Sequence, residues 1–320
     1  FQLPYLRIPG WETIKRNEIV VFNQPADTLL DMNDFNPDRN YYKPIDKKTN
    51  LVKRCVAIAG DTLEIRDGYV YINGIQNTLP YRAKLQFSYE VTLKPGKTFE
   101  RSIIEQLKTR YDITDGIYAM GNKIIIPAAS NEAVKVFKNH PSVATIDRFI
   151  EPKGQRDPLE FPHDPSYDWN RDFFGPLYIP EKGKTMALNL KNLPVYKRLI
   201  TEYEGNKLYT KGNQIFINGQ LSDSYTFKQN YYWMMGDNRH NSIDARRWGF
   251  VPFNHVVGKP VFIWMSWNTN GKGFNKIRWD RVFTTVHPDG ERTSYFIPFL
   301  VLLAVWIGYS KWRKRKNTTV

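Results

Sequence analysis

Short apolar runs, each about the length of a β-strand, follow one another along the first 75 residues of the chain. These runs lie at 18–22, 51–58, 63–65 and 69–72. Asp67-Gly68 separates the last two runs, and this residue pair is typical of a two-residue hairpin turn because both positions tolerate a positive φ. The pattern therefore predicts antiparallel strands over 1–75.

A similar hairpin returns much later in the chain. Ile217-Asn-Gly219 repeats the phrase Ile72-Asn-Gly74, and a long segment of different character separates the two. This arrangement predicts one antiparallel β core, built discontinuously from 1–75 and 213–285, that an insertion interrupts. We expect the fold to be mainly β.

The first part of the insertion, 85–150, alternates between strand and helix patterns. Strand-like runs enclose two segments with helical apolar spacing, 99–111 and 130–138, and Ser130 is a favourable N-cap for the second helix. The order β-α-β-β-α-β is that of a ferredoxin-like α+β lobe. The remaining segment, 154–212, is rich in Pro, Gly and aromatic residues and predicts irregular β structure.

An uncharged apolar stretch runs from Thr293 to Ser310. A membrane-spanning helix needs about 17–20 such residues, and Tyr and Trp lie near both ends, as they do at membrane interfaces. A buried core helix is the alternative, but core helices rarely lead into a basic tail. Five Lys and Arg residues follow within 311–316. We therefore expect a transmembrane helix at 293–310, a cytoplasmic tail at 311–320 and residues 1–290 on the opposite side.

Charge and composition narrow the choice of partner and cofactor. A net charge of +14 is compatible with nucleic acid or an anionic membrane, and the basic tail beside the apolar stretch favours membrane lipid over nucleic acid. The 41% hydrophobic content excludes a disordered chain. A single cysteine, Cys55, excludes an internal disulfide and a Cys-based zinc site. We expect no metal and no cofactor.

Two stretches carry candidate chemistry. Lys53 lies within the apolar run 51–58, where loss of hydration would lower the pKa of the lysine and provide a neutral amine as a general base. An edge-strand lysine that points into water is the alternative. The second stretch is a polar loop, for which a solvated turn is the alternative. Its polar residues are Asp237, Asn238, Arg239, Asn241, Ser242, Asp244 and Arg246.

Together these stretches resemble motifs of the bacterial type I signal peptidases, membrane-bound serine proteases that remove signal peptides from exported preproteins. Glu18–Phe22 resembles the strand ahead of the catalytic lysine, Val52–Asp61 the lysine box and Gly236–Arg246 the most characteristic box of the family. The segment 76–212 matches only members with a longer insert, such as those of the Bacteroidetes. The resemblance implies a β catalytic core of the kind that signal peptidases share with LexA-type repressors.

The resemblance also implies a role for individual residues. Lys53 falls on the general base and Ser242 on the serine that orients it, in a Ser–Lys variant of the catalytic triad. Val21 and Val52 fall on the wall of the substrate pocket, and Met234 falls beside the lysine stem. The positions that hold the backbone of the site and pair charges are Asp237, Arg239, Asp244 and Arg246.

The same resemblance implies exported preproteins as substrates and a place in the inner (plasma) membrane. The catalytic domain would face the periplasm, because exported signal peptides emerge on that side.

Several positions depart from the family pattern. His240 stands where most members have Asp, and Ala57, Ala59 and Ala245 replace Gly, Pro and Ser. Cys55 lies on the same strand face as Lys53, so a thiol nucleophile is an alternative to a small packing residue.

The nucleophile itself is the largest departure. The family's nucleophilic serine lies N-terminal to the strand at 18–22, whereas the first serine of this sequence is Ser88. We expect an N-terminally truncated chain that has the general base without its nucleophile and is inactive as such.

Two other classes of function stay open. One is a catalytically inactive, membrane-anchored homologue that acts as a binding module through its insertion. The other is a self-cleaving Ser–Lys regulator related to the LexA-type repressors, against which the apolar C-terminal stretch argues.

Overall fold

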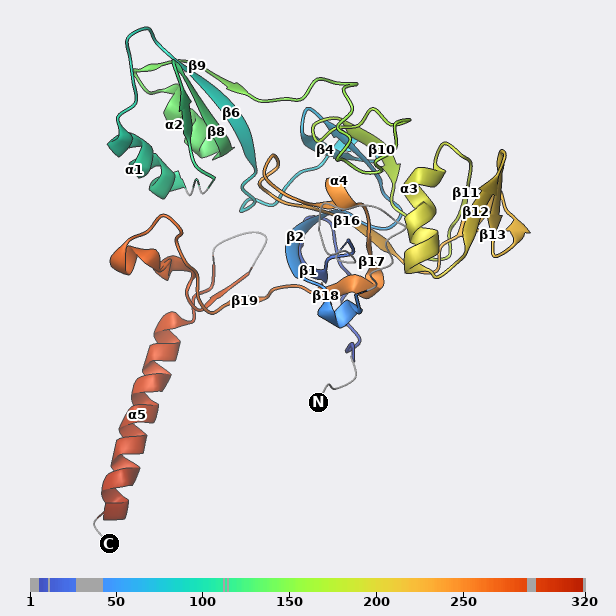
Figure 1. Ribbon diagram of the computed structural model, residues 1–320. Coiled ribbons are helices and arrows are strands. Elements are labelled where there is room, and N and C mark those ends of the chain that lie inside the picture. Colours follow the sequence, from blue (N-terminus) through green and yellow to red (C-terminus); the bar gives the residue numbers. More distant parts are fainter. Residues whose placement is uncertain are drawn as a thin grey trace.

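The computed structural model describes residues 6–10, 12–26, 43–111, 113, 115–286 and 292–318. Its β-strands pair antiparallel into several small sheets, with an α+β lobe on one side and a long C-terminal helix that leads away from the rest (Figure 1). The predicted fold class, mainly antiparallel β with an inserted lobe and a C-terminal apolar helix, is confirmed.

A five-stranded antiparallel sheet joins segments that are far apart in the sequence. In spatial order its strands are β17 (Val251–Pro252), β16 (Tyr231–Met235), β2 (Asn50–Ala57), β1 (Ile19–Asn23) and β18 (Val256–Gly258). The central strand β2 pairs with β1 on one side and with β16 on the other. Lys53 and the polar loop that follows β16 therefore meet on one sheet.

Tight turns at both Ile-Asn-Gly motifs build the smaller sheets. Asn73 and Asn218 have φ of 52° and 53°, and the glycine that follows each has a φ of 82° and 83°. Positive φ at both central positions is the geometry that matches the twist of a hairpin. The sheets are β10-β3-β4-β5 (Phe174–Tyr178, Thr62–Arg66, Tyr69–Ile72, Ile75–Gln76), β12-β13-β14 (Leu208–Lys211, Gln214–Ile217, Gln220–Leu221) and β11-β15 (Thr185–Ala187, Ser224–Thr226).

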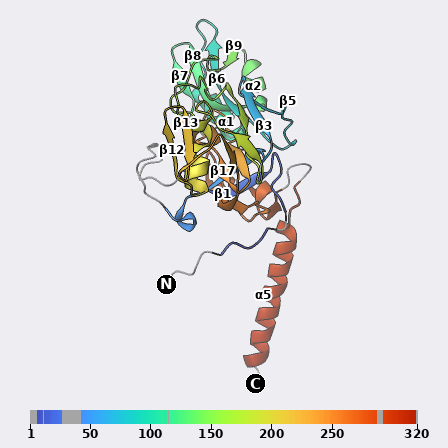
Figure 2. The same cartoon turned by 90° about the vertical axis from the view of Figure 1, so that its right-hand side faces the viewer.

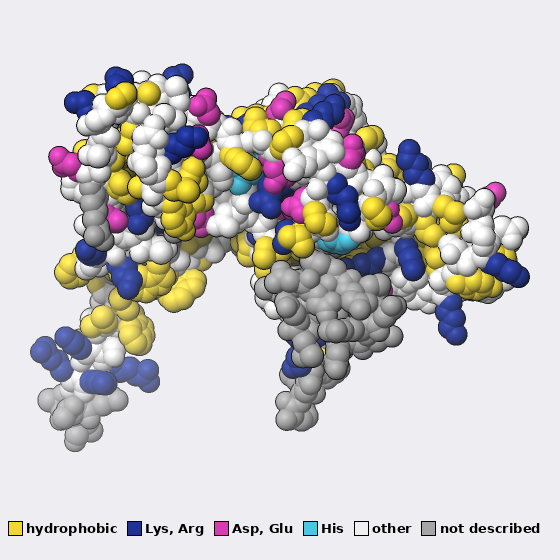
Figure 3. Space-filling view, turned by 45° about the horizontal axis from the view of Figure 1, so that its top comes forward, with side chains coloured by type: hydrophobic (Ala, Val, Ile, Leu, Met, Phe, Trp, Pro, Cys, Tyr) yellow, Lys and Arg dark blue, Asp and Glu magenta, His cyan; other side chains and the backbone are white. Residues whose placement is uncertain are grey.

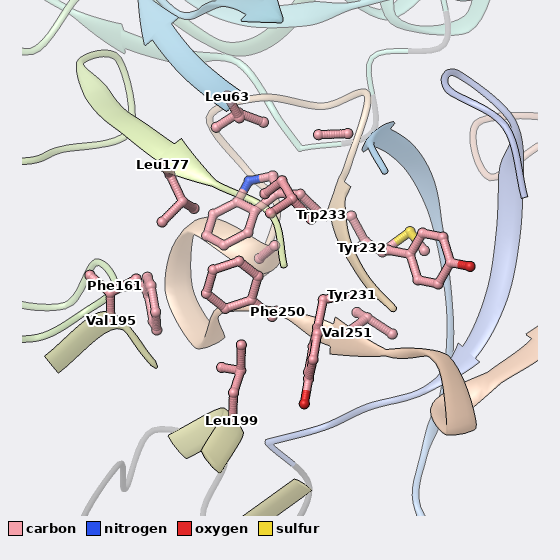
Figure 4. Close-up of a cluster of buried hydrophobic side chains, with 14 of the residues drawn as sticks. Leu63, Phe161, Leu177, Val195, Leu199, Tyr231, Tyr232, Trp233, Phe250 and Val251 are labelled. Carbon is pink, nitrogen blue, oxygen red and sulfur yellow. The ribbon is translucent and has the colours of Figure 1, made fainter. Parts of the chain in front are cut away.

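Aromatic side chains fill the core beneath the central sheet (Figure 4). Trp233 on β16 is fully buried, and its ring centroid lies 5.3 Å from that of Phe250 and 5.8 Å from that of Phe161. Edge-to-face contacts of this kind add to the stabilisation that burial of the rings provides. Because Trp233 lies three residues before Gly236, this packing fixes the point at which the polar loop begins.

The inserted lobe has a hydrophobic core of its own. Its elements are β6 (Gln86–Leu93), α1 (Arg101–Tyr111), β7 (Tyr118–Met120), β8 (Lys123–Ser130), α2 (Asn131–Lys138) and β9 (Val143–Arg148). The strand order β7-β8-β6-β9, antiparallel throughout, is the split βαβ arrangement that the sequence predicted. Ser130 caps α2, and its hydroxyl accepts a hydrogen bond from the Ala133 N–H.

The segment 154–212 differs from the prediction of irregular β structure. Besides strands β10, β11 and β12 it contains helix α3 (Leu193–Arg198), which continues as a π-helical turn over Leu199–Tyr203. Tyr196, Leu199 and Ile200 are buried in the same cluster as Trp233. This part of the insertion therefore belongs to the core of the molecule, because it covers apolar surface that the central sheet leaves open.

The C-terminal region leads from the core to a long apolar helix. Strands β19 (Phe262–Ile263) and β20 (Thr284–Thr285) precede α5 (Phe296–Thr318), and short α4 (Ala245–Trp248) lies near the polar loop. Short 3-10 turns occur at Ile45–Lys47, Phe253–His255, Gly273–Lys276 and Trp279–Arg281.

Helix α5 projects away from the body of the molecule (Figure 2). Its stretch Phe296–Arg315 is long and apolar enough to cross a membrane. The apolar part of this stretch is not buried against the described residues of the protein. Figure 3 shows its apolar side chains followed by a group of Lys and Arg near its end. The helix begins three residues later than the predicted 293 and continues into the basic segment expected as a tail.

Candidate active site

Lys53 and Ser242 meet where β16 ends beside the central strand β2. Lys53 lies on β2, and Ser242 lies in the loop between β16 and α4. The Lys53 Nζ donates a hydrogen bond of 2.7 Å to the Ser242 Oγ. The predicted contact between these side chains, 189 positions apart in the sequence, is confirmed.

The environment of Lys53 favours its neutral form. Burial lowers the pKa of the Lys53 ammonium because the charged form loses hydration. The carboxylate of Asp244 acts in the opposite direction, and the Arg246 guanidinium reinforces the lowering. A lysine with a lowered pKa next to a hydroxyl is the arrangement that general-base chemistry requires.

Gly236 makes this approach possible. A Cβ at position 236 would lie 2.1 Å from the Ser242 Oγ, 2.6 Å from the Ser242 Cβ and 3.4 Å from the Lys53 Nζ. The first two distances are far below van der Waals contact. The absence of a side chain at Gly236 is therefore a condition for the Lys53–Ser242 hydrogen bond.

Two ion pairs hold the loop on either side of Ser242. Arg54 binds Asp237 through two hydrogen bonds of 2.8 Å and 2.6 Å. Arg246 binds Asp244 through its Nε and Nη2 at 2.9 Å and 2.8 Å, and Asp244 also accepts the Gly236 N–H at 3.0 Å. Bidentate pairs of this kind fix orientation as well as charge. The loop thus enters and leaves the site at fixed points.

Arg239 is buried without a carboxylate partner among the described residues, whereas Asp237, Asp244 and Arg246 each form an ion pair. The Arg239 Nη1 donates a weak hydrogen bond to the Met235 Sδ at 4.0 Å. Burial lowers the pKa of the Arg239 guanidinium to about 10. The charge pairing that the sequence suggested is thus present at Asp237, Asp244 and Arg246.

The residues predicted to line the substrate pocket lie on the strands around Lys53. Val21 on β1 is the direct cross-strand partner of Val52 on β2, and Val52 is 56% exposed. Met234 on β16 is fully buried and lies opposite Cys55. Val21 and Val52 form an accessible apolar pair on the strand of Lys53 and the strand next to it, whereas Met234 belongs to the interior. Their roles toward a substrate stay predictions.

Cys55 is a packing residue in this structure. Its side chain is fully buried, and its thiol donates to the Ala57 carbonyl at 3.4 Å. Burial raises the pKa of the Cys55 thiol far above its usual range, and the negative charges of Asp61 and Glu18 add to this. These features disfavour the thiol-nucleophile alternative.

The described part of the chain offers no cluster of three or more His, Cys, Asp or Glu side chains with metal-binding geometry.

Comparison with known proteins identifies the family to which the chain belongs. The sequence profile described as "Signal peptidase, peptidase S26" matches residues 6–123 and 178–267, more than half of the chain. The match includes Lys53 and the whole of the 236–246 loop. The chain belongs to the S26 signal peptidase family.

Individual relatives within this family are similar over different parts of the chain. Signal peptidase I of Helicobacter pylori strain J99 is 24% identical over 229 residues, which cover 63% of this chain and 77% of that protein. Signal peptidase I of Pseudomonas aeruginosa is 43% identical over 146 residues, which cover 29% and 51%. The relative from Buchnera aphidicola subsp. Schizaphis graminum is 34% identical over 108 residues, and the chain spans only 33% of its length.

The structure adds residues that the sequence did not single out. The only sequence indication that Arg54 pairs with Asp237 is its position next to Lys53, as a second charge within an apolar run. Gly236 is the first residue of the family box 236–246, but the sequence assigns it no role of its own. Ser88 and Asp172, which hold His240 at 3.0 Å and 2.9 Å, lie in the insertion, and no pattern in the sequence connects them with the loop.

Proposed function

We propose that this protein is a signal peptidase I that removes signal peptides from exported preproteins by Ser/Lys chemistry, with Lys53 as general base. The observation that carries the proposal is the 2.7 Å hydrogen bond between Lys53 and Ser242 inside the region that matches the S26 family. Fold and family membership alone would leave the chemistry open, because activity resides in the site.

In this proposal Ser242 orients the lysine and Lys53 moves the proton. A serine hydroxyl adds to the carbonyl carbon of the scissile peptide bond, and the Lys53 Nζ takes its proton. The ammonium returns that proton to the leaving nitrogen as the C–N bond breaks. Water then hydrolyses the acyl-enzyme, again with Lys53 as base. The family's nucleophilic serine precedes the strand that corresponds to β1, and none of the serines from Ser88 onward is proposed for that role.

The proposal also covers the substrate pocket and the place of action. Val21 and Val52 present an apolar surface that suits small side chains before the cleavage point. Helix α5 would anchor the protein in the inner membrane, with membrane lipid around it. The basic residues after the span favour a cytoplasmic C-terminus and a periplasmic catalytic domain.

Cleavage of a preprotein by the complete protein in detergent tests the proposal. We expect Lys53→Ala to reduce kcat/KM by about 10²–10⁴-fold, because that is the usual contribution of a general base. Lys53→Arg should be equally defective, since a guanidinium stays protonated. Lys123→Ala is the matched control, because Lys123 is a half-exposed lysine of the inserted lobe.

Each outcome distinguishes the candidate functions. An active Lys53→Arg variant would overturn the role of Lys53. A parent protein that binds signal peptides without cutting them would instead identify an inactive homologue that acts as a binding module.

A further inference from the structure

His240 occupies a closed hydrogen-bond site between the polar loop and the insertion. The Ser88 N–H donates to its Nδ1 at 3.0 Å, and its Nε2 lies 2.9 Å from the Asp172 Oδ1. Because Nδ1 accepts a hydrogen bond, the ring proton must lie on Nε2, which donates it to Asp172. The side chains of His240 and Asp172 are only 4% and 1% exposed.

The surroundings of Asp172 hold its carboxylate in position to accept this hydrogen bond. Its second carboxylate oxygen accepts the Glu151 N–H at 3.0 Å. A Cβ at Gly68 would lie 2.8 Å from the Asp172 Oδ1, so the β3–β4 turn leaves room for the carboxylate only because position 68 is glycine. A carboxylate fixed from both sides is a rigid acceptor, and His240 is thereby held in one tautomer and one orientation.

Two segments of the insertion bind the loop near His240. At the start of β6, the Gln86 N–H donates to the Asp237 carbonyl at 2.9 Å, and the Gln86 carbonyl accepts the Arg239 N–H at 2.8 Å. In the second part of the insertion, 154–212, the Arg171 Nη1 donates to the His240 carbonyl at 2.9 Å. Residues 237–240 are therefore bracketed by the inserted lobe and by the segment around residue 172.

The identity of residue 240 fits this arrangement specifically. The sequence resemblance places Asp at this position in most signal peptidases of the family. An aspartate here would bring a second carboxylate against Asp172 and would have no proton to donate at neutral pH. Histidine supplies an acceptor toward Ser88 and a donor toward Asp172 at the same time. The histidine and the insertion are thus complementary.

We infer that His240 is a positioning residue through which the insertion holds Ser242 against Lys53. The inference rests on the proposed function and deepens it. His240 precedes Ser242 by two residues, so a shift of its ring is transmitted along a very short piece of backbone. The insertion thereby sets the geometry of the catalytic pair, although none of its side chains described above contacts Lys53.

Three substitutions separate the two hydrogen bonds of His240. His240→Asn can still accept from Ser88, His240→Gln can still donate to Asp172, and His240→Ala can do neither. We expect His240→Ala to lower kcat by about 10²-fold at unchanged KM, since displacing a catalytic group by about 1 Å costs that much. The Asn and Gln variants should fall between His240→Ala and the parent. His140→Gln, a histidine substitution within the inserted lobe, should have no effect.

The pKa of Lys53 provides a readout that does not depend on cleavage. ¹³C-methylated lysines of the complete protein can be titrated by NMR, and the Lys53→Arg variant assigns the Lys53 signal. In His240→Ala the pKa of Lys53 should move up toward that of an ordinary lysine, because a displaced loop admits water around the amine. If His240→Ala does not fold, the Asn and Gln variants and Asp172→Asn provide the same comparison.

The outcomes separate this inference from the proposed function. A folded His240→Ala variant with unchanged kcat and an unchanged Lys53 titration would overturn the positioning role. A rise in KM alone would also overturn it, because the residue would then act on substrate binding. A parent protein without peptidase activity would refute the proposed function, and the Lys53 titration would still decide whether His240 positions the loop.

Discussion

At the residue scale, Lys53 lies near two carboxylates that already have partners of their own. Arg54 binds Asp237, and Arg246 binds Asp244. Burial therefore dominates the environment of Lys53, and the favourable charge of Asp244 only partly offsets it. An unshared carboxylate at the same place would keep the lysine protonated and remove its value as a base.

The pH dependence of cleavage is the first prediction at this scale. A general base must be deprotonated to act, so kcat/KM should rise with pH through the pKa of Lys53 in the free protein. Because burial lowers that pKa, the midpoint of the rise should lie below the value of about 10.4 for an ordinary lysine. Initial rates measured from acidic to alkaline pH test this. A rise centred on the ordinary lysine value would contradict it.

Gly236→Ala is the second prediction. The new methyl group would overlap the Ser242 Oγ and Cβ, and Ser242 would have to move away from Lys53. We expect a loss in kcat of at least about 10²-fold, with a smaller change in unfolding temperature. Gly258→Ala is the control, because a Cβ there meets no atom within 4 Å and Gly258 does not have a positive φ. Equal activity of both variants would show that the tight approach at Gly236 is not required.

The Lys53–Ser242 contact was predictable from the sequence, whereas the residues that support it were not. Lys53 is conspicuous as a charge within an apolar run, and Ser242 stands in a loop dense in polar residues. The roles of Ser88 and Asp172 depend on two segments of the insertion folding back onto that loop. Such tertiary contacts leave no periodicity in the chain, so pattern analysis has nothing to detect.

At the scale of secondary-structure elements, the central strand β2 determines the architecture of the site. It binds β1 and β16 along its two edges, and the pairing with β16 shifts register between Trp233 and Met234. A bulge of this kind redirects the chain at the end of a strand. Here it lies just before Gly236, where β16 gives way to the loop that carries Ser242.

The N-cap of α2 provides a prediction for the lobe. The Ser130 hydroxyl accepts the Ala133 N–H, and removing such a cap costs about 1 kcal/mol. Ser130→Ala should lower the free energy of unfolding of the lobe by that amount without changing kcat. Hydrogen exchange of the lobe amides measures the effect. Ser142→Ala is the control, since its hydroxyl has no hydrogen bond among the described residues, and an equal loss in both variants would contradict the capping role.

Helix α3 shows where element prediction failed. Tyr196, Leu199, Ile200 and Tyr203 have helical spacing, and all but Tyr203 are buried in the main core. The signal is short and begins at Pro194, within a region rich in Pro, Gly and aromatic residues. Proline is well tolerated in the first turn of a helix, but among other Pro and Gly residues it is more readily interpreted as part of a loop. By contrast, the lobe alternates cleanly between strand and helix patterns, and its topology was predictable.

At the scale of the whole molecule, the apolar stretch of α5 lies apart from the hydrophobic core. The apolar side chains of α5 lie outside the body of the protein; Leu302, Val305 and Trp306 are each more than 60% exposed. An exposed apolar helix of this length is costly in water and favourable in a bilayer. The proposed topology therefore places the core with Lys53 and Ser242 on one side of a membrane and the basic end of α5 on the other.

The single cysteine makes this topology measurable. Cys55 is buried, and burial raises the pKa of its thiol, so it should not react with a maleimide in the folded protein. An introduced cysteine is then the only reactive thiol in the described part of the chain. Ile75→Cys places one on β5, where Ile75 is 75% exposed, and Lys314→Cys places one in the basic end of α5.

Labelling of the two variants in intact cells is the last prediction. The excess of Lys and Arg after the span favours a cytoplasmic C-terminus. A membrane-impermeant maleimide, added to cells whose outer membrane has been permeabilised, should label Ile75→Cys but not Lys314→Cys. Both variants should be labelled after lysis. The parent protein should not be labelled in intact cells or after lysis. Labelling of Lys314→Cys in intact cells would place the basic end outside and the Lys53–Ser242 pair in the cytoplasm, where it would not meet signal peptides that have crossed the membrane.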